Sequence, residues 1–355
     1  MQPTCSLPQV HKTNQTMAGV FTISLDFELH WGVFDKRDRK SRLLCYQNTI
    51  RTVPKMLALF EAHGVHVTWA TVGSMFASDA EEWNQLKPSL QPEYANEGYS
   101  PYRWVAQHGL QPEYHVAHFA PDAVKSILQY KGQELGTHTF SHYYCLEQVK
   151  QPEAFEADLK AANAAALKFG TQTTSLIFPR NQYNAQALRV CYENGIRVVR
   201  SNPDARFWTP INDKDASLLR KVLRTGDAYI QLGSTRSSYP LTAIAKRVNE
   251  PMLLPASRFL RPWHPAHRFT NKLMLRRINK ELETAAKLHE CYHLWWHPEN
   301  FGDFPQENLE NLAIVLEQYK KYRQKYGMQS WNMGEYEHHL ADKYVKHEHQ
   351  VCNVG

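Results

Sequence analysis

The sequence predicts an α/β fold built from repeating β/α units, because short apolar segments of strand type alternate with longer segments of helical period. A chain of 355 residues with 43% hydrophobic side chains can bury a full core, and its length suits one large domain. Parallel strands closed into a barrel would bring their carboxyl ends to one rim, where such folds gather their chemistry. Strands are predicted over 20–25, 65–72, 133–137, 175–178, 196–200, 229–232 and 292–296.

Between these strands, three segments have the apolar spacing and the end signals of helices. A glycine follows each of them and can adopt the left-handed conformation that ends a helix. The second helix begins with Pro121, which suits the first helical position. The predicted helices cover 49–63, 121–131 and 152–169, and the glycines stand at 64, 132 and 170.

Two proline-rich segments break this alternation. Residues 88–120 combine prolines and aromatic residues with little helical period, which indicates a long insertion that shapes a substrate cleft. Residues 201–261 contain a single apolar run, near Tyr229. We expect polar tails at 1–16 and at 336–355, the second of them His-rich and solvated, around a folded domain at 17–335.

Charge and cysteine content narrow the class of protein. The net charge of +6 is mild, so no nucleic-acid partner is expected, and the basic segment 258–277 is either an anion contact or a solvated face. The six cysteines form no CxxC pair, which favours reduced thiols in the cytoplasm. The sequence has no readable secretion signal and no apolar run long enough to span a membrane.

The strongest chemical signal is a pair of histidines, His138 and His142, which follow the predicted strand at 133–137. Residues four apart lie on one face of a helical turn, and imidazole is the commonest nitrogen ligand of zinc. Hydrogen bonding in a packed core is the alternative. The hydroxyl groups near the pair suit the support of metal ligands, and they belong to Thr137, Thr139 and Ser141.

Two carboxylates, Asp26 and Glu28, follow the first strand, and a regular strand points residues two apart to the same side. An acid at the end of a buried strand is costly without a partner, which favours a chemical role over a surface salt bridge. Two histidines and one carboxylate commonly bind a catalytic divalent metal and leave a position for water. One carboxylate would bind the metal while the other accepts a proton from the water.

A third candidate, His297, ends the strand predicted at 292–296. Imidazole titrates near neutral pH, so His297 could act as a general acid, with a structural histidine before proline as the alternative. The adjacent Trp295 and Trp296 could keep water from it, and one of them could stack on a pyranose ring.

In order, these segments resemble the motifs of the polysaccharide deacetylase family, also called the NodB-homology or carbohydrate esterase 4 family. The resemblance spreads over about 20–302 and implies a distorted (β/α) barrel of about seven strands. It also implies hydrolysis of an N-acetyl group from an amino sugar by a divalent metal and a carboxylate base. The matching segments are Ser24-Leu25-Asp26-Phe27-Glu28, His138-Thr139-Phe140-Ser141-His142, Phe178-Pro179-Arg180-Asn181-Gln182 and His293-Leu294-Trp295-Trp296-His297-Pro298.

The resemblance implies a role for each matching position. Asp26 resembles the catalytic base, Arg180 the arginine that orients this base, and His297 the general acid. His138 and His142 resemble the metal-binding pair. Glu28 resembles the third metal ligand.

The chain departs from the family pattern in two motifs. The usual pattern has two adjacent aspartates, whereas here Phe27 separates Asp26 from a glutamate, so the two carboxylates could exchange roles. Pro179 precedes Arg180, where the commoner order places the arginine first. The remaining family motif has no clear match, although the segment that begins at Arg200 lies in the corresponding part of the chain.

We therefore expect a cytoplasmic metal-dependent deacetylase that acts on an N-acetylated sugar in a polysaccharide or glycan precursor. Zinc is the first choice of metal, and cobalt, manganese or iron suit the same ligands. One alternative is an amidohydrolase acting on a non-sugar C–N bond, such as that of a small cyclic ureide. The other alternative is a catalytically inactive homologue that binds a glycan.

Overall fold

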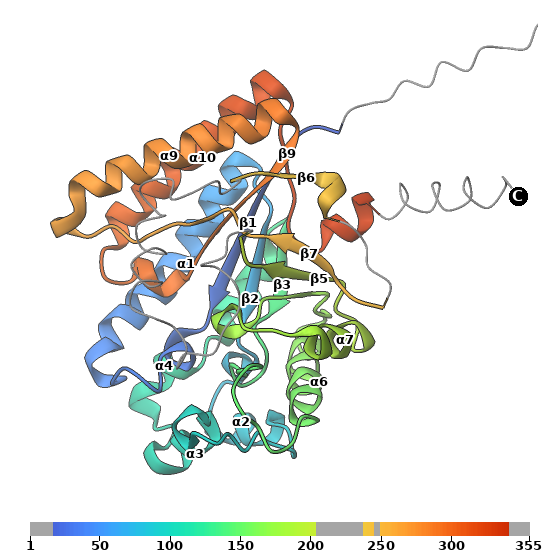
Figure 1. Ribbon diagram of the computed structural model, residues 1–355. Coiled ribbons are helices and arrows are strands. Elements are labelled where there is room, and N and C mark those ends of the chain that lie inside the picture. The colour runs from blue at the N-terminus through green and yellow to red at the C-terminus, as the bar shows by residue number, and fades with distance from the viewer. Residues whose placement is uncertain (1–16, 204–236, 245–248, 341–355) are drawn as a thin grey trace, which may run out of the picture.

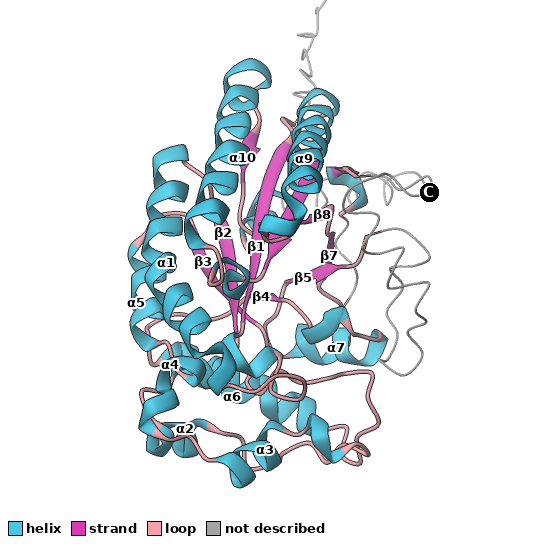
Figure 2. Ribbon diagram, turned by 90° about the vertical axis from the view of Figure 1, so that its left-hand side faces the viewer, coloured by secondary structure: helices cyan, strands magenta, loops and turns pink. Residues whose placement is uncertain are grey.

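A computed structural model describes residues 17–203, 237–244 and 249–340 of the chain. The strands form one sheet in the order β6-β9-β1-β2-β3-β4-β5-β7, and every pairing from β9 to β7 is parallel. Helices surround this sheet, which curves into a nearly closed barrel (Figures 1 and 2). The predicted α/β fold and its parallel barrel are confirmed.

Six of the predicted strands are present, with ends that differ by up to two residues, and the run at 229–232 lies outside the described residues. The strands are β1 Val20–Phe27, β2 Val67–Thr71, β3 Gln133–Thr137, β4 Ser175–Leu176, β5 Val198–Ser201, β6 Tyr239–Pro240, β7 Met252–Pro255, β8 Arg258–Phe259, β9 Glu290–Trp296 and β10 Gln329–Ser330.

The barrel is closed by one short stretch of chain that pairs on both sides. Strand β7 pairs with β5, and two residues later β8 pairs with β9 at the other end of the sheet. The hydrogen bond from Ser257 N–H to the His293 carbonyl, at 2.8 Å, continues this second pairing. The stretch from β7 to β8 therefore brings β5 and β9 close together across the barrel.

Helices connect the strands as the spacing predicts. Helix α1 ends at a left-handed Gly64 with φ of 61°, as expected, but it begins six residues earlier than predicted. The main helices are α1 Leu43–His63, α5 Pro121–Gln129, α6 Ala154–Leu167, α7 Ala185–Glu193, α9 Arg268–Leu288 and α10 Pro305–Tyr326. None of the helices in the described part of the chain is long and apolar enough to cross a membrane.

Along most of β1, alternation places apolar side chains on the outer face of the strand and polar side chains on its inner face. On β1, Phe21, Ile23, Leu25 and Phe27 join the main hydrophobic core beneath the helices. The intervening side chains are polar and also buried: Thr22, Ser24 and Asp26. Because residues two apart share a face, the same strand supplies both the core and the polar interior that leads to the rim.

The insertion at 88–120 contains α3 Pro101–His108 and α4 His115–His118, and it follows α2 Ala80–Leu86. Arg39 anchors it by donating hydrogen bonds to the carbonyl of Gly109, at 2.7 Å, and to the side chain of Gln111, at 2.6 Å. The same guanidinium lies 4.2 Å from the ring centre of Tyr114. The insertion is thus fixed to the segment between β1 and α1.

The C-terminal tail begins later than predicted. Tyr336 is fully buried, and its hydroxyl lies 2.7 Å from Oγ1 of Thr22 inside the barrel. Leu340 is also buried in the core. The predicted boundary at 336 is therefore wrong, and the predicted tails at 1–16 and beyond 340 lie outside the described residues.

Candidate active site

A cavity of about 650 Å³ lies at the carboxyl-end rim of the barrel. Segments that follow β1, β3 and β9 all contribute to it, as the parallel arrangement predicts. Its lining includes most of the residues singled out by sequence: Asp26, Glu28, His138, His142, Arg180, Trp295 and His297. Among the described residues, its lining includes none from the insertion at 88–120, so the expectation that this insertion shapes the cleft directly is wrong.

Glu28, His138 and His142 converge on one point and form what we call the rim cluster. Oε2 of Glu28 lies 3.2 Å from Nε2 of His138 and 3.1 Å from Nε2 of His142. One donor atom from each residue lies within 4.8 Å of the others, which is an arrangement that could hold a metal ion. Two imidazoles and a carboxylate are a suitable ligand set for a divalent transition metal.

The two histidines come together in a loop and not in the predicted helical turn. Thr139 and His142 both have left-handed backbone conformations, with φ of 64° and 59°. The loop is held by Asp158 of α6, whose carboxylate accepts hydrogen bonds from the backbone of Phe140 and from the side chain of Ser141. Burial raises the pKa of Asp158 to about 6, against the lowering effect of these bonds.

The hydroxyl groups beside the histidines support the loop and not the imidazoles. Oγ1 of Thr137 accepts from the N–H of Thr139 at 3.0 Å, and Oγ1 of Thr139 accepts from the N–H of Tyr143 at 2.8 Å. For His142, the Nδ1 partner is the Tyr144 hydroxyl at 3.2 Å. Tyr144 is therefore a supporting residue that the sequence did not indicate.

Electrostatics favours an ionised carboxylate in the rim cluster. Burial acts to raise the pKa of Glu28, but the charge of His297 and the hydrogen bonds with His138 and His142 lower it well below its usual value. Burial lowers the pKa of His142 to about 4, so this imidazole is neutral near pH 7. A buried carboxylate beside a neutral imidazole is well suited to a bound cation.

Asp26 has a different partner from the one predicted. Arg200 of β5 reaches across the barrel and donates to both carboxylate oxygens of Asp26, at 2.6 and 2.7 Å. We call these two residues the interior pair. Burial acts to raise the pKa of Asp26, but Arg200 and His297 outweigh it, so the pKa is lowered. The prediction that Arg180 is the arginine beside Asp26 is wrong.

Arg180 supports the other side of the site. Its Nη2 donates to Asp35 at 2.5 Å and to the Tyr144 hydroxyl at 3.1 Å, and its guanidinium lies 3.9 Å from the Tyr144 ring centre. Because Tyr144 in turn contacts His142, Arg180 is linked to the rim cluster through one hydroxyl group. The left-handed backbone at Arg180, with φ of 56°, was not evident from the sequence.

His297 faces both carboxylates from the end of β9. Its Nε2 lies 3.8 Å from Oδ2 of Asp26 and 3.6 Å from Oε1 of Glu28. Its side chain is 26% exposed, whereas those of the rim histidines are almost fully buried. His297 is therefore the imidazole of the site that an incoming substrate can reach.

The two tryptophans before His297 lie on opposite faces of β9. Trp295 is 9% exposed, lines the cavity and packs against the Arg200 guanidinium, 4.1 Å from the ring centre. Trp296 is fully buried and stacks on Phe301, with ring centres 5.7 Å apart. The prediction of a substrate contact is thus wrong for Trp296 and remains open for Trp295.

Glu299 also borders the cavity and was not singled out by sequence. It lies two residues after His297, and its Oε1 accepts the backbone N–H groups of Glu28, at 2.8 Å, and of Leu29. Burial and the negative charge of Glu28 raise the pKa of Glu299 to about 8. The site thus contains a third carboxyl group, which is held against the backbone of Glu28 and Leu29.

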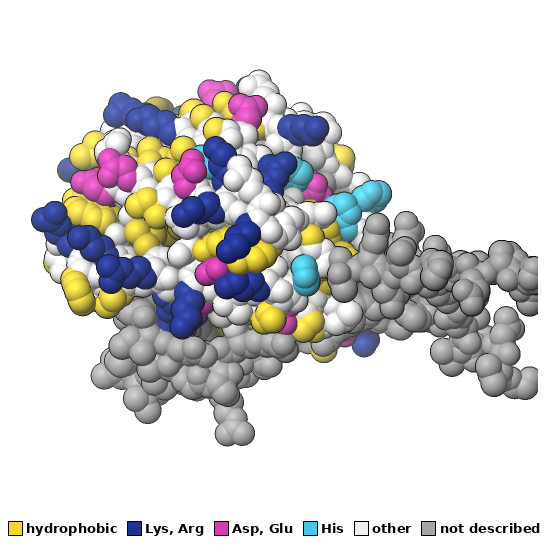
Figure 3. Space-filling model, turned by 90° about the horizontal axis from the view of Figure 1, so that it is seen from above, with side chains coloured by type: hydrophobic (Ala, Val, Ile, Leu, Met, Phe, Trp, Pro, Cys, Tyr) yellow, Lys and Arg dark blue, Asp and Glu magenta, His cyan; other side chains and the backbone are white. Residues whose placement is uncertain are grey.

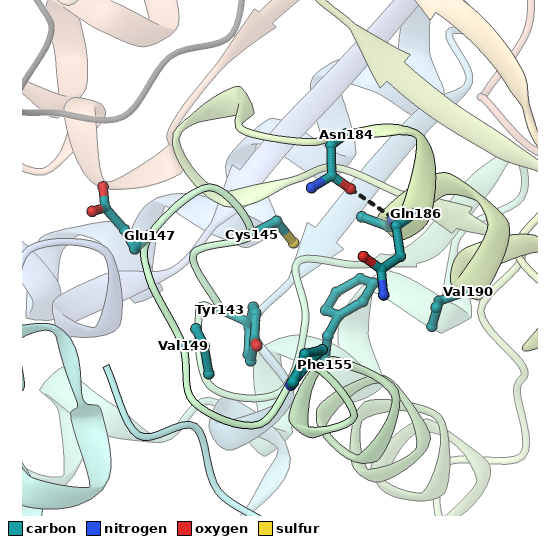
Figure 4. Close-up of a pocket in the computed structure, with 10 residues that line it drawn as sticks. Tyr143, Cys145, Glu147, Val149, Phe155, Asn184, Gln186 and Val190 are labelled. Atoms are coloured by element: carbon teal, nitrogen blue, oxygen red, sulfur yellow. Dashed lines mark hydrogen bonds between the residues drawn. The ribbon is translucent and has the colours of Figure 1, made fainter. Parts of the chain in front are cut away.

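A second, smaller cavity of about 180 Å³ lies between the loop after the rim histidines and α7 (Figure 4). Tyr143, Val149 and Phe155 form much of its wall, and the Asn184 side chain caps α7 beside it. It contains none of the predicted catalytic or metal-binding residues. Its shape comes from the packing of this loop on α6 and α7.

The basic segment at 258–277 is partly structural. Arg258 is buried and pairs with Glu281 at 2.6 Å, and Arg277 pairs with the same carboxylate at 2.8 Å. The end-on view of the molecule shows Lys and Arg side chains interspersed with acidic and apolar ones (Figure 3). This mixed pattern is typical of a solvated face.

A comparison with protein families finds a match over part of the chain. Residues 35–199 match the family model described as polysaccharide deacetylase. The matched range contains the two rim histidines, while Asp26, Glu28 and His297 lie outside it. No curated protein matches the chain.

Several solved structures share the fold. A candidate polysaccharide deacetylase from Mycobacterium smegmatis is similar at 12% identity and a TM-score of 0.57, with 96% of each chain covered. Puue allantoinase is similar at 11% identity and a TM-score of 0.53, covering 92% of this chain and 91% of that one. A candidate polysaccharide deacetylase from Pseudomonas aeruginosa PAO1 is similar at 10% identity and a TM-score of 0.50, with 90% of each chain covered.

Proposed function

We propose that the chain, whose residues 35–199 match the polysaccharide deacetylase family model, removes N-acetyl groups from an amino sugar within a polysaccharide or glycan precursor. The observation that carries the proposal is the convergence of the rim cluster, Asp26 and His297 on one cavity. An ion-binding cluster, an ionised carboxylate and a reachable imidazole are the groups that hydrolysis of an amide needs.

The residues present fit a divalent metal. Glu28, His138 and His142 supply one oxygen and two nitrogen donors, already directed at a common point. Zinc suits this set best, and cobalt, manganese or iron could replace it. When bound, such an ion activates water and polarises the acetyl carbonyl.

We propose different roles for the two carboxylates. Glu28 belongs to the cluster of donor atoms, whereas Asp26 does not, so we assign Glu28 as the ligand and Asp26 as the base. The Arg200 guanidinium keeps Asp26 ionised and fixes the orientation of its carboxylate. Asp26 would accept one proton from the attacking water.

We assign His297 as the general acid of the reaction. As water forms the new C–O bond of acetate, the C–N bond breaks and the amine nitrogen needs a proton. His297 lies within 4 Å of both carboxylates and is partly exposed, so it can donate this proton from the side where the sugar enters. Proton acceptance and donation are thus assigned to different residues, Asp26 and His297.

The cavity suits a sugar. Its volume of about 650 Å³ lies in the range of sites for small-molecule and cofactor ligands and leaves room beyond a single amide group. Trp295 offers part of an aromatic ring at its wall.

We also propose a cytoplasmic location, supported by the free thiols of the described cysteines Cys45, Cys145, Cys191 and Cys291.

The test is acetate release by metal-loaded protein from nucleotide-linked and lipid-linked N-acetylhexosamines and from acetylated oligosaccharides. Release that stops in Asp26→Asn and in His297→Ala, with metal content unchanged in both, supports the proposal. Lack of release from every acetylated sugar by protein that holds its metal would contradict it.

A second candidate is hydrolysis of a non-sugar C–N bond, favoured by the fold likeness to an allantoinase. The same metal-loaded samples should be offered a cyclic ureide such as allantoin. Ring opening of the ureide without acetate release would replace the sugar with this substrate class. The third possibility, an inactive glycan-binding protein, predicts glycan binding that survives Asp26→Asn without any turnover.

A further inference from the structure

Glu28, the proposed metal ligand, lies just beyond the end of β1. Glu28 follows β1, and its backbone, with φ of −133° and ψ of −15°, turns out of the strand. The next residue, Leu29, is left-handed with φ of 47°. A flexible side chain on a strained turn needs support to hold its carboxylate at one point.

Gly32 provides the space for the Glu28 side chain. A methyl group at position 32 would lie 2.7 Å from Cγ of Glu28 and closer still to its carboxylate. Gly32 has no positive φ, so its backbone conformation is open to alanine. The requirement for glycine therefore comes from the Glu28 carboxylate, which could escape a methyl group only by leaving the imidazoles.

Glu299 holds the backbone of the same turn. Its Oε1 accepts the N–H groups of Glu28, at 2.8 Å, and of Leu29, and its residue is only 7% exposed. It belongs to the short helix that begins directly after His297. The Glu299 carboxyl group therefore ties the segment that carries the proposed general acid to the turn that carries the proposed metal ligand.

We propose that Gly32 and Glu299 are positioning residues that hold the Glu28 carboxylate at the point where His138 and His142 meet. The inference rests on the proposed function, because it takes Glu28 as the metal ligand. It explains how an Asp-Phe-Glu sequence serves in place of two adjacent aspartates. Gly32 admits the longer side chain, and Glu299 fixes the turn from which it extends.

The first experiment measures zinc affinity by competition with a chromophoric chelator, which needs no substrate. Gly32→Ala should weaken zinc binding by about tenfold or more, as loss of support around a ligand does. In the Glu28→Ala background, the same change should have no further effect, because the carboxylate that it displaces is gone. Gly98→Ala is the matched control, since Gly98 is exposed and a methyl group there would meet only the Asn96 side chain.

The second experiment separates the effect of the accepting oxygen of Glu299 from the effect of its charge. Glu299→Gln keeps an oxygen that can accept both N–H groups, so its zinc affinity should stay within about threefold of the original protein, whereas Glu299→Ala should lose about tenfold or more. Glu134→Ala serves as control, because Glu134 is a carboxylate bonded to Thr68 and Ser175 away from the cavity. It should lower the unfolding temperature without changing zinc affinity.

The outcomes separate the two claims. Unchanged zinc affinity in Gly32→Ala and Glu299→Ala, with the original protein binding zinc, overturns the inference and leaves the proposed function standing. Equal losses in Glu299→Gln and Glu299→Ala would also overturn it, because the charge and not the acceptor oxygen would then matter. Failure of the original protein to bind any metal would remove the proposed function and the inference together. If Gly32→Ala does not fold, the Glu299 pair decides.

Discussion

Asp26 and Glu28 are two residues apart on one segment, yet the protein surrounds them in opposite ways. The interior pair gives Asp26 a permanent cation, because the Arg200 guanidinium contacts both of its oxygens. The rim cluster gives Glu28 only imidazoles, and burial lowers the pKa of His142 to about 4. The first carboxylate is internally neutralised, whereas the second is left to attract a cation.

This difference shows how one strand end can supply two chemical functions. The alternation of β1 places Asp26 inside the barrel, where a residue from the opposite side can reach it. The chain then leaves the strand, and Glu28 turns to the loop after β3. Because the backbone changes direction between them, the proposed base contacts a fixed charge and the proposed ligand contacts two imidazoles.

The largest effect is expected when the rim cluster is emptied. His138→Ala/His142→Ala should lose bound metal and lower acetate release by about 10³-fold or more, because the ion supplies most of the activation. Metal content and acetate release are measured on the same samples. His63→Ala/His66→Ala, which alters two histidines that pair with glutamates outside the cavity, should change neither. A double variant that keeps its metal would remove the rim cluster from the account.

The interior pair should be costly to break from one side. Arg200→Met leaves Asp26 buried without its cation, which typically costs about 3–5 kcal/mol of unfolding free energy. In an Asp26→Asn background the same change should cost much less, whereas the cost of Arg180→Met should not change. Urea unfolding of the two double-mutant cycles checks this. Coupling of Asp26 to Arg180 in place of Arg200 would contradict the assignment of Arg200 as the partner of Asp26.

Neighbouring tryptophans should separate substrate contact from packing. Trp296→Ala should cost about 3–5 kcal/mol of unfolding free energy, because its ring fills the outer core. Trp295→Ala should raise KM for the acetylated sugar and should alter stability less, because its ring lies at the cavity wall. Chemical unfolding and steady-state kinetics on both variants test the contrast. It fails if Trp296→Ala raises KM in a fully stable protein.

The smallest expected effect is a pH dependence that arises inside the barrel. Burial lowers the pKa of His293 from 6.5 to about 3, and its Nε2 lies 2.8 Å from Oγ of Ser24. Neutral His293 therefore favours the folded state above pH 6.5, and this contribution is lost as the pH falls from 6.5 toward 3. The loss is about 1 kcal/mol per pH unit.

His293→Gln should flatten the dependence of unfolding free energy on pH between 6 and 4. His289→Gln provides the control, because His289 follows α9 at its C-terminal end and does not belong to the barrel interior. Unfolding titrations at several pH values measure both slopes. Equal slopes in His293→Gln and the original protein would contradict the assignment.

Much of the fold could be predicted, because the local spacing of apolar residues indicates the alternation of strands and helices. The closing stretch from β7 to β8 could not, since each strand is short and its pairing depends on distant partners. The convergence of Asp26, His138 and His297 was predictable for a simple reason. Each lies at or just after the carboxyl end of a parallel strand.

The predicted site is wrong where the direction of a side chain matters, whereas the types of residue that form the site were predicted. Arg180 and Arg200 both lie near strand ends, and only the three-dimensional path shows that Arg200 reaches across the barrel. A signal was present, since an arginine that ends an apolar strand needs a carboxylate partner. Parity could also have separated the tryptophans, because Trp295 and His297 are two residues apart and share a face.

The most direct test of this account is the metal content of Asp26→Asn and Glu28→Gln, loaded with zinc side by side. The division of roles predicts about one zinc per chain in Asp26→Asn and little in Glu28→Gln, with acetate release lost from both. The reverse pattern, with zinc retained by Glu28→Gln and lost from Asp26→Asn, would exchange the ligand and the base and contradict the central claim.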